Sequence, residues 1–153
     1  MKRILYWLWR VLPLPKSLQS SLMWLINTKF VAGTSVLVQN NQDQILLFKH
    51  LYRKDKPWGF PGGYVKRGEN PDQAIQRELT EESGLKLKNL HLLEIIQSPE
   101  MARMEILFGG ELDGEIDFTP SMEVTKAQFF SLDQLPELIP EHQVIIKRYL
   151  IIK

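Results

Sequence analysis

A single helix with both of its ends marked lies in the middle of this chain. Asn70 is a favourable N-cap residue and Pro71 stands at the first helical position, so a helix is expected to begin there. Gly84 is the kind of residue that commonly ends a helix, so the helix is predicted to run to Ser83. These two boundaries place every side chain between residues 71 and 83 at helical spacing.

Apolar segments before and after this helix are predicted as strands. Residues 30–38 and 44–48 precede it, and the polar residues 40–43 between them supply turn chemistry, so the two strands are expected to pair as a hairpin. Further strands are expected at residues 90–97, 101–112 and 127–132. A last helix is expected to begin at Pro140, with the inward-facing residues Val144, Ile145, Tyr149 and Ile152.

The first 42 residues differ in composition from the rest of the chain. Of 19 basic and 18 acidic residues, five basic and no acidic ones fall here, which leaves 14 basic and 18 acidic residues in the remainder. Three of the four Trp residues also lie here, namely Trp7, Trp9 and Trp24. Apolar residues recur at helical spacing on both sides of Pro13 and Pro15, which predicts two short helices. We therefore expect residues 1–29 to form a helical extension and residues 30–153 to form the main domain.

This extension is not expected to cross a membrane or to be a signal peptide. Its apolar run is far shorter than the roughly 20 residues that a span requires, and no small-residue cleavage site follows it. The protein is accordingly expected in the cytoplasm. The apolar surface of the extension needs a partner, which can be the main domain, a second subunit or an anionic membrane surface. A homodimer through residues 1–29 is favoured, because the four cations of residues 1–16 give only about 4 kcal/mol of attraction to such a surface.

Composition excludes several other kinds of site. The absence of Cys rules out a disulfide framework, a thiol nucleophile and Cys-ligated zinc or iron–sulfur sites. The three His residues, at positions 50, 91 and 142, lack the spacing of metal ligands. The net charge of +1 gives no reason to expect a nucleic-acid partner.

Three glutamates of the predicted helix share one of its faces. Glu78, Glu81 and Glu82 stand at i, i+3 and i+4, within an arc of about 100°. Carboxylates so placed repel one another unless a cation joins them, and hard divalent cations such as Mg²⁺ prefer oxygen ligands. Taken alone, the triplet is also compatible with an ordinary solvated helix face.

The triplet belongs to a longer pattern. Gly63 is followed after five residues by Glu69, and after seven more by residues 77–85, Arg-Glu-Leu-Thr-Glu-Glu-Ser-Gly-Leu. This pattern resembles the Nudix box and departs from it at none of its nine specified positions. The chain is therefore identified as a member of the Nudix hydrolase superfamily, with a similarity that extends over about residues 31–140.

The resemblance implies a fold and a metal site. The fold is an α/β class, an α/β/α sandwich around a mixed sheet, in which the box forms a loop–helix–loop. The metal is expected to be Mg²⁺, with Mn²⁺ as a substitute. Its expected ligands are the carbonyl of Gly62 and the carboxylates of Glu78, Glu81, Glu82 and, from beyond the box, Glu123. Arg77 is expected to fork to Glu69 and to fix the loop against the helix.

Glu123 is chosen because members of this family commonly recruit one more acid from beyond the box. It precedes by six residues the aromatic strand segment that begins at Phe129, which resembles that of the family. Glu105 and Glu111 on the preceding strand are weaker candidates, and Glu123 is also compatible with a solvated loop residue.

The resemblance also implies a reaction, the hydrolysis of a nucleoside diphosphate linked to another moiety. Glu78, Glu81 and Arg77 are the expected catalytic residues, and Glu78 is favoured as the general base. ADP-ribose or a similar sugar nucleotide is favoured as substrate, because Pro99 stands fourteen residues after the box, as in that branch. Cations near the box could meet outer phosphates, namely Lys54, Lys56, Lys66 and Arg67.

Other functions stay open at this point. One alternative is a pyrophosphohydrolase of nucleoside triphosphates or oxidised nucleotides, and another is a nucleotide-binding sensor without catalysis. A membrane-surface scaffold that uses residues 1–29 is the third.

Overall fold

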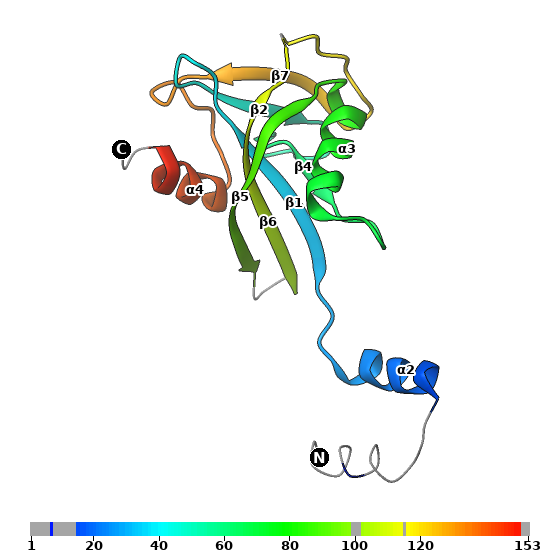
Figure 1. Ribbon diagram of the computed structural model, residues 1–153. Helices are drawn as coiled ribbons and strands as arrows, with labels where there is room; N and C mark the ends of the chain where they lie inside the picture. The colour runs from blue at the N-terminus through cyan, green and yellow to red at the C-terminus, as the bar shows by residue number, and fades with distance from the viewer. Residues whose placement is uncertain (1–6, 8–14, 99–101, 115, 151–153) are drawn as a thin grey trace. The chain divides into compact units, whose positions relative to one another are not determined.

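The computed structural model describes residue 7 and residues 15–98, 102–114 and 116–150 of the 153-residue chain (Figure 1). The chain divides into two compact units, Met1–Phe30 and Val31–Lys153, and each is described by itself. In the described parts of both units, no helix has the length and apolar character that a membrane crossing requires.

Helix α2, Lys16–Ile26, belongs to the first unit. It matches the second helix predicted for the extension, whereas the first, at residues 4–12, lies outside the described residues except for Trp7. Trp24, Leu25 and Ile26 are 69%, 66% and 56% exposed, and no residue of α2 is buried. Within its own unit, α2 therefore presents large apolar side chains to its surroundings.

Two sheets form the framework of the second unit. The first contains β1 (Val31–Val38), β4 (Gly62–Tyr64), β5 (Leu87–Ser98) and β6 (Arg103–Leu112) in the order β4-β1-β6-β5. The second contains β2 (Ile45–His50), β3 (Trp58–Gly59) and β7 (Val124–Phe130) in the order β3-β2-β7. Because β1 is parallel to β6 but antiparallel to β4, the predicted mixed sheet is confirmed.

The predicted hairpin of β1 and β2 is wrong. The turn itself is present, since the Asn40 N–H donates to the Gln44 carbonyl at 3.0 Å, and Gln39 and Ile45 form an isolated antiparallel β-bridge. Beyond the turn the two strands enter different sheets: β6 pairs with β1 from Val31 to Val38, and β4 pairs with Gly33 to Ser35 on the other edge. Strand β2 pairs instead with β3 and β7.

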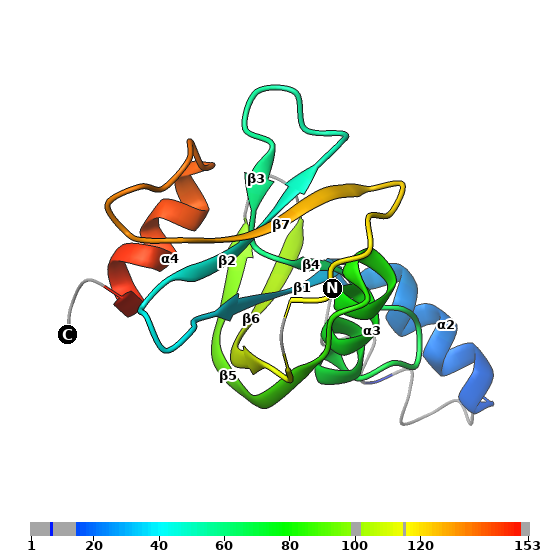
Figure 2. The same cartoon turned by 90° about the horizontal axis from the view of Figure 1, so that it is seen from above.

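Helices α3 (Pro71–Ser83) and α4 (Pro140–Leu150) lie on opposite sides of these strands (Figures 1 and 2). Ile75 and Leu79 of α3 pack in one buried cluster, and Ile145 and Ile146 of α4 pack in another. Successive residues of β1 and β2 alternate between the clusters, with Val36, Val38, Leu46 and Phe48 in the first and Leu37, Ile45 and Leu47 in the second. This arrangement confirms the α/β/α sandwich.

Both ends of α3 lie where the sequence predicts them. The backbone N–H of Asn70 donates to the side-chain oxygen of Gln73 at 3.2 Å, which closes the first turn. Gly84 takes the left-handed conformation, with φ of 75°, and its N–H donates to the Thr80 carbonyl at 2.9 Å. The glutamate triplet is therefore carried on a helix with defined ends.

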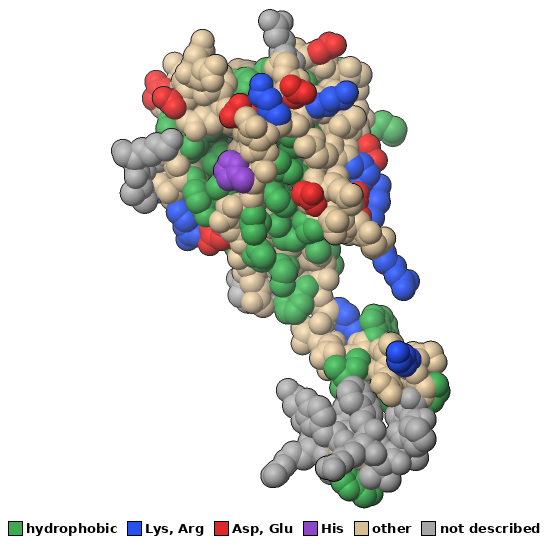
Figure 3. Space-filling view, in the orientation of Figure 1, with side chains coloured by type: hydrophobic (Ala, Val, Ile, Leu, Met, Phe, Trp, Pro, Cys, Tyr) green, Lys and Arg blue, Asp and Glu red, His purple; other side chains and the backbone are tan. Residues whose placement is uncertain are grey.

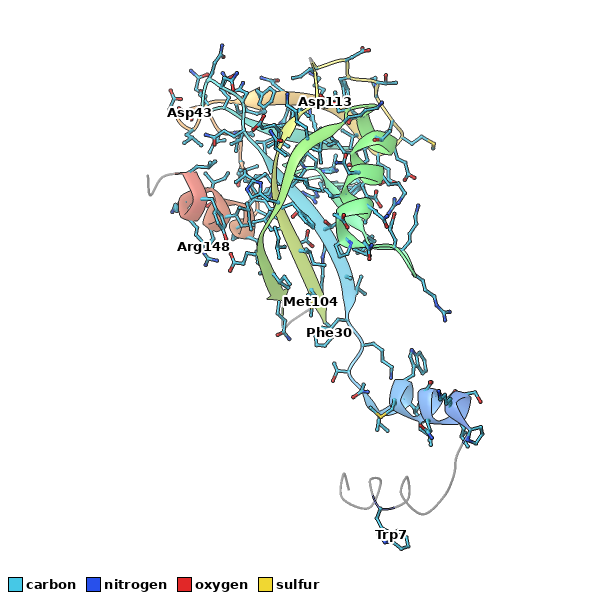
Figure 4. The ribbon with its side chains drawn as sticks, viewed as in Figure 1. Trp7, Phe30, Asp43, Met104, Asp113 and Arg148 are labelled. Atoms are coloured by element: carbon cyan, nitrogen blue, oxygen red, sulfur yellow. The ribbon has the colours of Figure 1, made fainter. Side chains whose placement is uncertain are left out.

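The face that α4 buries differs from the prediction. Val144 is 53% exposed, whereas Ile145 and Ile146 are 4% and 2% exposed. The helix is turned this way because it also meets β5. There the Tyr149 hydroxyl donates to Glu94 at 3.1 Å, and Arg148, which is labelled in Figure 4, pairs with the same carboxylate. The prediction for Val144 is thus wrong, and Ile152 lies outside the described residues.

Candidate metal-binding and catalytic site

Strand β4 approaches α3 through two glycines. A Cβ added at Gly63 would lie 2.3 Å from Cδ of Glu78, and one added at Gly62 would lie 2.3 Å from the carbonyl oxygen of Thr34. The obstacle at Gly62 is backbone and the obstacle at Gly63 is the Glu78 side chain, so the β4 backbone fits closely between the sheet and the Glu78 carboxylate. The role of the Gly62 carbonyl as a metal ligand stays a prediction.

Arg77 joins this strand, the following loop and the helix. Its Nε and Nη2 donate to the two carboxylate oxygens of Glu69 at 2.8 and 2.9 Å, which is the forked pair that the Nudix resemblance implied. Its Nη1 donates to Glu78 at 2.6 Å and to Glu81 at 3.1 Å, and Nη2 also donates to the Tyr64 carbonyl at 3.0 Å. One guanidinium therefore fixes the positions of two of the three helix glutamates.

Glu69 stays ionised in this arrangement. Hydrogen bonds from Arg77, and then one of 3.1 Å from the Lys66 N–H, lower the pKa of Glu69 to about 2. The Lys66 side chain lies 3.7 Å from Glu81. Acidic and basic side chains accordingly gather along the α3 side of the molecule (Figure 3).

Glu82 has a different environment from its two neighbours. Its side chain is buried, and its Oε2 has no hydrogen-bond partner. Burial, followed by the charges of Glu78 and Glu123, raises the pKa of Glu82 to about 8, while Arg53 acts in the opposite direction. An unpaired buried carboxylate is costly, and a bound cation removes that cost. The donor set at Glu82 therefore fits a hard divalent cation.

Glu123 reaches this site from the start of β7. Its charge acts on Glu82, and its backbone carbonyl accepts a hydrogen bond of 2.8 Å from the Leu51 N–H. The fold therefore brings Glu123 to the glutamate triplet from a distant part of the sequence. Its role as a ligand stays a prediction.

The two weaker candidates have other partners. Glu105 accepts hydrogen bonds of 2.9 and 2.6 Å from Nε and Nη2 of Arg103. Glu111 accepts one of 3.3 Å from the side chain of Asn89. Among the three acids considered, Glu123 is the one whose charge raises the pKa of Glu82.

The carboxylates do not form a ready-made ligand cage. Within the described ranges, no three His, Asp or Glu side chains are arranged to hold a metal ion. The hydrogen bonds of Glu78 and Glu81 explain this, since both carboxylates are turned toward Arg77. A cation that takes all three helix glutamates must therefore compete with Arg77 for two of them.

The cations expected to meet outer phosphates are distributed differently. Lys56 pairs with Glu137 at 3.3 Å, and Lys66 is drawn to Glu81, whereas Lys54 and Arg67 are exposed. Pro99 lies outside the described residues. Sequence reasoning missed Arg53, whose charge reaches Glu82. Its one signal was its place in the basic loop directly before Trp58-Gly59.

Comparisons with known proteins agree with the resemblance of residues 63–85 to the Nudix box. A family model described as the NUDIX domain matches residues 29–149. An ADP-ribose pyrophosphatase from Methanocaldococcus jannaschii is 35% identical over 133 residues, which cover 78% of this chain and 72% of that protein. The NAD-capped RNA hydrolase NudC from Photorhabdus laumondii is 34% identical over 119 residues, which cover 77% of this chain and 46% of NudC.

The fold has matching solved structures as well. The crystal structure of a NUDIX hydrolase from Nitrosomonas europaea superposes with a TM-score of 0.68, covering 82% of this chain and 72% of that one, at 20% identity. That likeness supports the fold alone. The family model and the relatives in sequence show that this chain belongs to the Nudix hydrolase superfamily, and the prediction of the family is confirmed.

Proposed function

We propose that this chain is a divalent-metal-dependent pyrophosphohydrolase that cleaves a nucleoside diphosphate linked to another moiety, with ADP-ribose or a similar sugar nucleotide as the favoured substrate. The observation that carries the proposal is Glu82, a buried carboxylate with an unpartnered oxygen beside Glu78 and Glu123. The relative from Methanocaldococcus jannaschii, named an ADP-ribose pyrophosphatase, supports the substrate class.

Mg²⁺, or Mn²⁺ in its place, would be held by oxygen ligands of the box and its surroundings. The proposed ligands are the Gly62 carbonyl and the carboxylates of Glu78, Glu81, Glu82 and Glu123. Once bound, the cation supplies positive charge that neutralises adjacent phosphates and polarises water.

The side chains of the chain itself perform the remaining tasks. Glu78 is proposed to take the proton of the attacking water, and its carboxylate is already aligned by Arg77. Oxygen from that water bonds to one phosphorus, and the bond between this phosphorus and the bridging oxygen breaks. Arg77 is a positioning group here, since its five N–H donors are used on Glu69, Glu78, Glu81 and the Tyr64 carbonyl.

Residues 1–29 are proposed to serve a protein partner, with a homodimer favoured over contact with an anionic membrane. The exposed Trp24, Leu25 and Ile26 of α2 support a role in association. The division into an extension, residues 1–29, and a Nudix domain, residues 30–153, is part of this proposal, as is a cytoplasmic location.

A panel of nucleotides tests the proposal directly. The purified full-length protein is incubated with ADP-ribose, other sugar nucleotides, nucleoside triphosphates and an oxidised triphosphate, with Mg²⁺, Mn²⁺ or EDTA. Metal-dependent release of AMP and a phosphorylated sugar from ADP-ribose is expected. Turnover of triphosphates alone, with release of pyrophosphate, would favour the alternative substrate class. Binding without turnover of any compound would favour a nucleotide sensor.

A further inference from the structure

Some buried polar side-chain atoms of this chain have no hydrogen-bond partner. Among the residues that the structure describes, these atoms are Oε2 of Glu82, Nη1 of Arg53 and both ring nitrogens of His50. Leaving such an atom unpaired is unfavourable, because the atom has lost its hydrogen bonds to water without replacement. His50 and Arg53 are three residues apart, and Leu51 between them is hydrogen-bonded to the backbone of Glu123.

Arg53 stands on a loop tied to the candidate site at both ends. The loop leaves β2 after His50, and the His50 N–H donates to the Pro57 carbonyl at 2.8 Å where the chain returns. The first residue of the loop, Leu51, donates its N–H to the Glu123 carbonyl at 2.8 Å. The loop is therefore anchored to the same segment that brings Glu123 to the carboxylates.

The guanidinium of Arg53 is held against neighbouring groups. A Cβ added at Gly59 would lie 2.4 Å from Nη1 of Arg53 and 2.9 Å from Cε1 of His142, so the absence of a side chain there makes room for both. Cζ of Arg53 also lies 5.6 Å from the ring centroid of Tyr52, within the range of a cation–π contact. The side chain is thus placed in advance, which lowers the entropy cost of using it to bind a ligand.

The two histidines beside Arg53 are neutral at pH 7. Burial, and then the charge of Arg53, lowers the pKa of His50 to about 4 and that of His142 to about 3. Arg53 is therefore the cation of this group of three. Its neighbours in the loop differ from it, since Lys54 is exposed and Lys56 pairs with Glu137.

We propose that Arg53 binds a phosphate of the substrate and that Gly59, His50 and His142 hold it in position. The proposal rests on the function proposed above, because a nucleoside diphosphate and its cation would supply a partner for the Arg53 guanidinium and one for the Glu82 carboxylate. The cation is a suitable partner for the unpaired Oε2 of Glu82, and the phosphate is a suitable partner for the unpaired Nη1 of Arg53. A guanidinium can donate two parallel hydrogen bonds to a phosphate, which Lys cannot do.

Imidodiphosphate is a suitable probe, since its P–N–P link resists hydrolysis. Its binding to the full-length protein with Mg²⁺ is measured by calorimetry for the wild type and for Arg53→Ala, Arg53→Lys, Gly59→Ala and the control Lys88→Ala. We expect Arg53→Ala to weaken binding about 10-fold or more, and Arg53→Lys and Gly59→Ala to weaken it by smaller factors. Lys88→Ala, which removes an exposed cation of β5 that has no proposed role in binding, should stay within about twofold.

Arg53 could instead act only as a positive charge that offsets the Glu82 carboxylate. The Mg²⁺ affinity measured without imidodiphosphate separates that role from phosphate binding. If Arg53 binds phosphate, Arg53→Ala binds Mg²⁺ at least as well as the wild type while it loses imidodiphosphate. Unchanged imidodiphosphate affinity in Arg53→Ala, or no binding by the wild type, would overturn the proposal. If Arg53→Ala does not fold, the imidodiphosphate affinities of Arg53→Lys and Gly59→Ala test the proposal. Wild-type affinity in both of these variants would also overturn it.

The same measurements keep the two proposals apart. A wild type that binds imidodiphosphate through Arg53 but cleaves no sugar nucleotide leaves the phosphate site standing and removes the proposed reaction. A wild type that cleaves ADP-ribose with the same KM as Arg53→Ala leaves the reaction standing and removes the phosphate site.

Discussion

Replacing Glu82 by Gln is expected to stabilise the metal-free protein while it removes activity. The pKa of Glu82 is about 8 in the folded protein against an ordinary value of 4.5, so the folded state binds more protons than the unfolded state between these pH values. Wild-type stability should therefore fall as the pH rises from 4.5 to 8. At about 1.4 kcal/mol per pKa unit, this carboxylate destabilises the fold by about 4 kcal/mol at pH 7.5 and by under about 1 kcal/mol at pH 5.

Gln keeps the shape of Glu but not its charge. Its amide stays partly unpaired at a cost of roughly 1–3 kcal/mol, so we expect a net gain of about 1–3 kcal/mol at pH 7.5 and a net loss of up to about 2 kcal/mol at pH 5. Glu81→Gln is the matched control, because the Glu81 side chain is 54% exposed on the same helix. Its free energy of unfolding should change by less than about 1 kcal/mol.

Urea unfolding in EDTA at pH 7.5 and at pH 5 measures these differences. Added Mg²⁺ should raise the unfolding midpoint of the wild type more than that of Glu82→Gln, since a cation that binds the folded state stabilises it. Turnover of Glu82→Gln should fall on the order of 10²-fold or more. The reasoning is wrong if the variant is no more stable than the wild type in EDTA at pH 7.5, or if the difference is the same at both pH values.

Three further predictions concern other parts of the molecule. Glu123→Gln should lower kcat more than it raises KM in steady-state assays, and changes of both constants within about twofold would instead mark Glu123 as a solvated residue. Deletion of residues 1–29 should change the mass by light scattering from dimer to monomer or cause aggregation; a monomeric full-length protein that co-sediments with anionic vesicles in a salt-sensitive way would contradict this. Because the pKa of His50 is lowered to about 4, its burial should destabilise the fold as the pH falls from 6.5 toward 4, by about 2 kcal/mol at pH 5. His50→Gln should lose less stability than the wild type between pH 7 and pH 5 in urea unfolding, and an equal loss would show that His50 is not the cause.

Local spacing alone identified the helix, its ends and its family. Asn70-Pro71 and Gly84 act on the backbone within a few residues, so their effect does not depend on the rest of the fold. The same holds for the glutamate triplet, because residues at i, i+3 and i+4 share a helix face wherever that helix lies. Arg77 and Glu69 could be paired because they belong to one motif.

Tertiary structure decided the features that depend on distant contacts. The sequence could not show that β1 would pair with β4 and β6 while β2 paired with β7 in another sheet. The exposure of Val144 follows from the way α4 meets β5, which its own apolar spacing does not contain.

The electrostatics of the site were likewise decided by the fold. Glu78, Glu81 and Glu82 are alike in the sequence, yet one of them is buried without a partner while Arg77 takes the other two. In the sequence, Arg53 is one of several cations in a basic loop. In the fold, the missing side chain at Gly59 leaves room for its guanidinium, and its charge acts on Glu82. Burial and charge at a site are set by segments that meet only in space, so residue type and spacing along the chain cannot determine them.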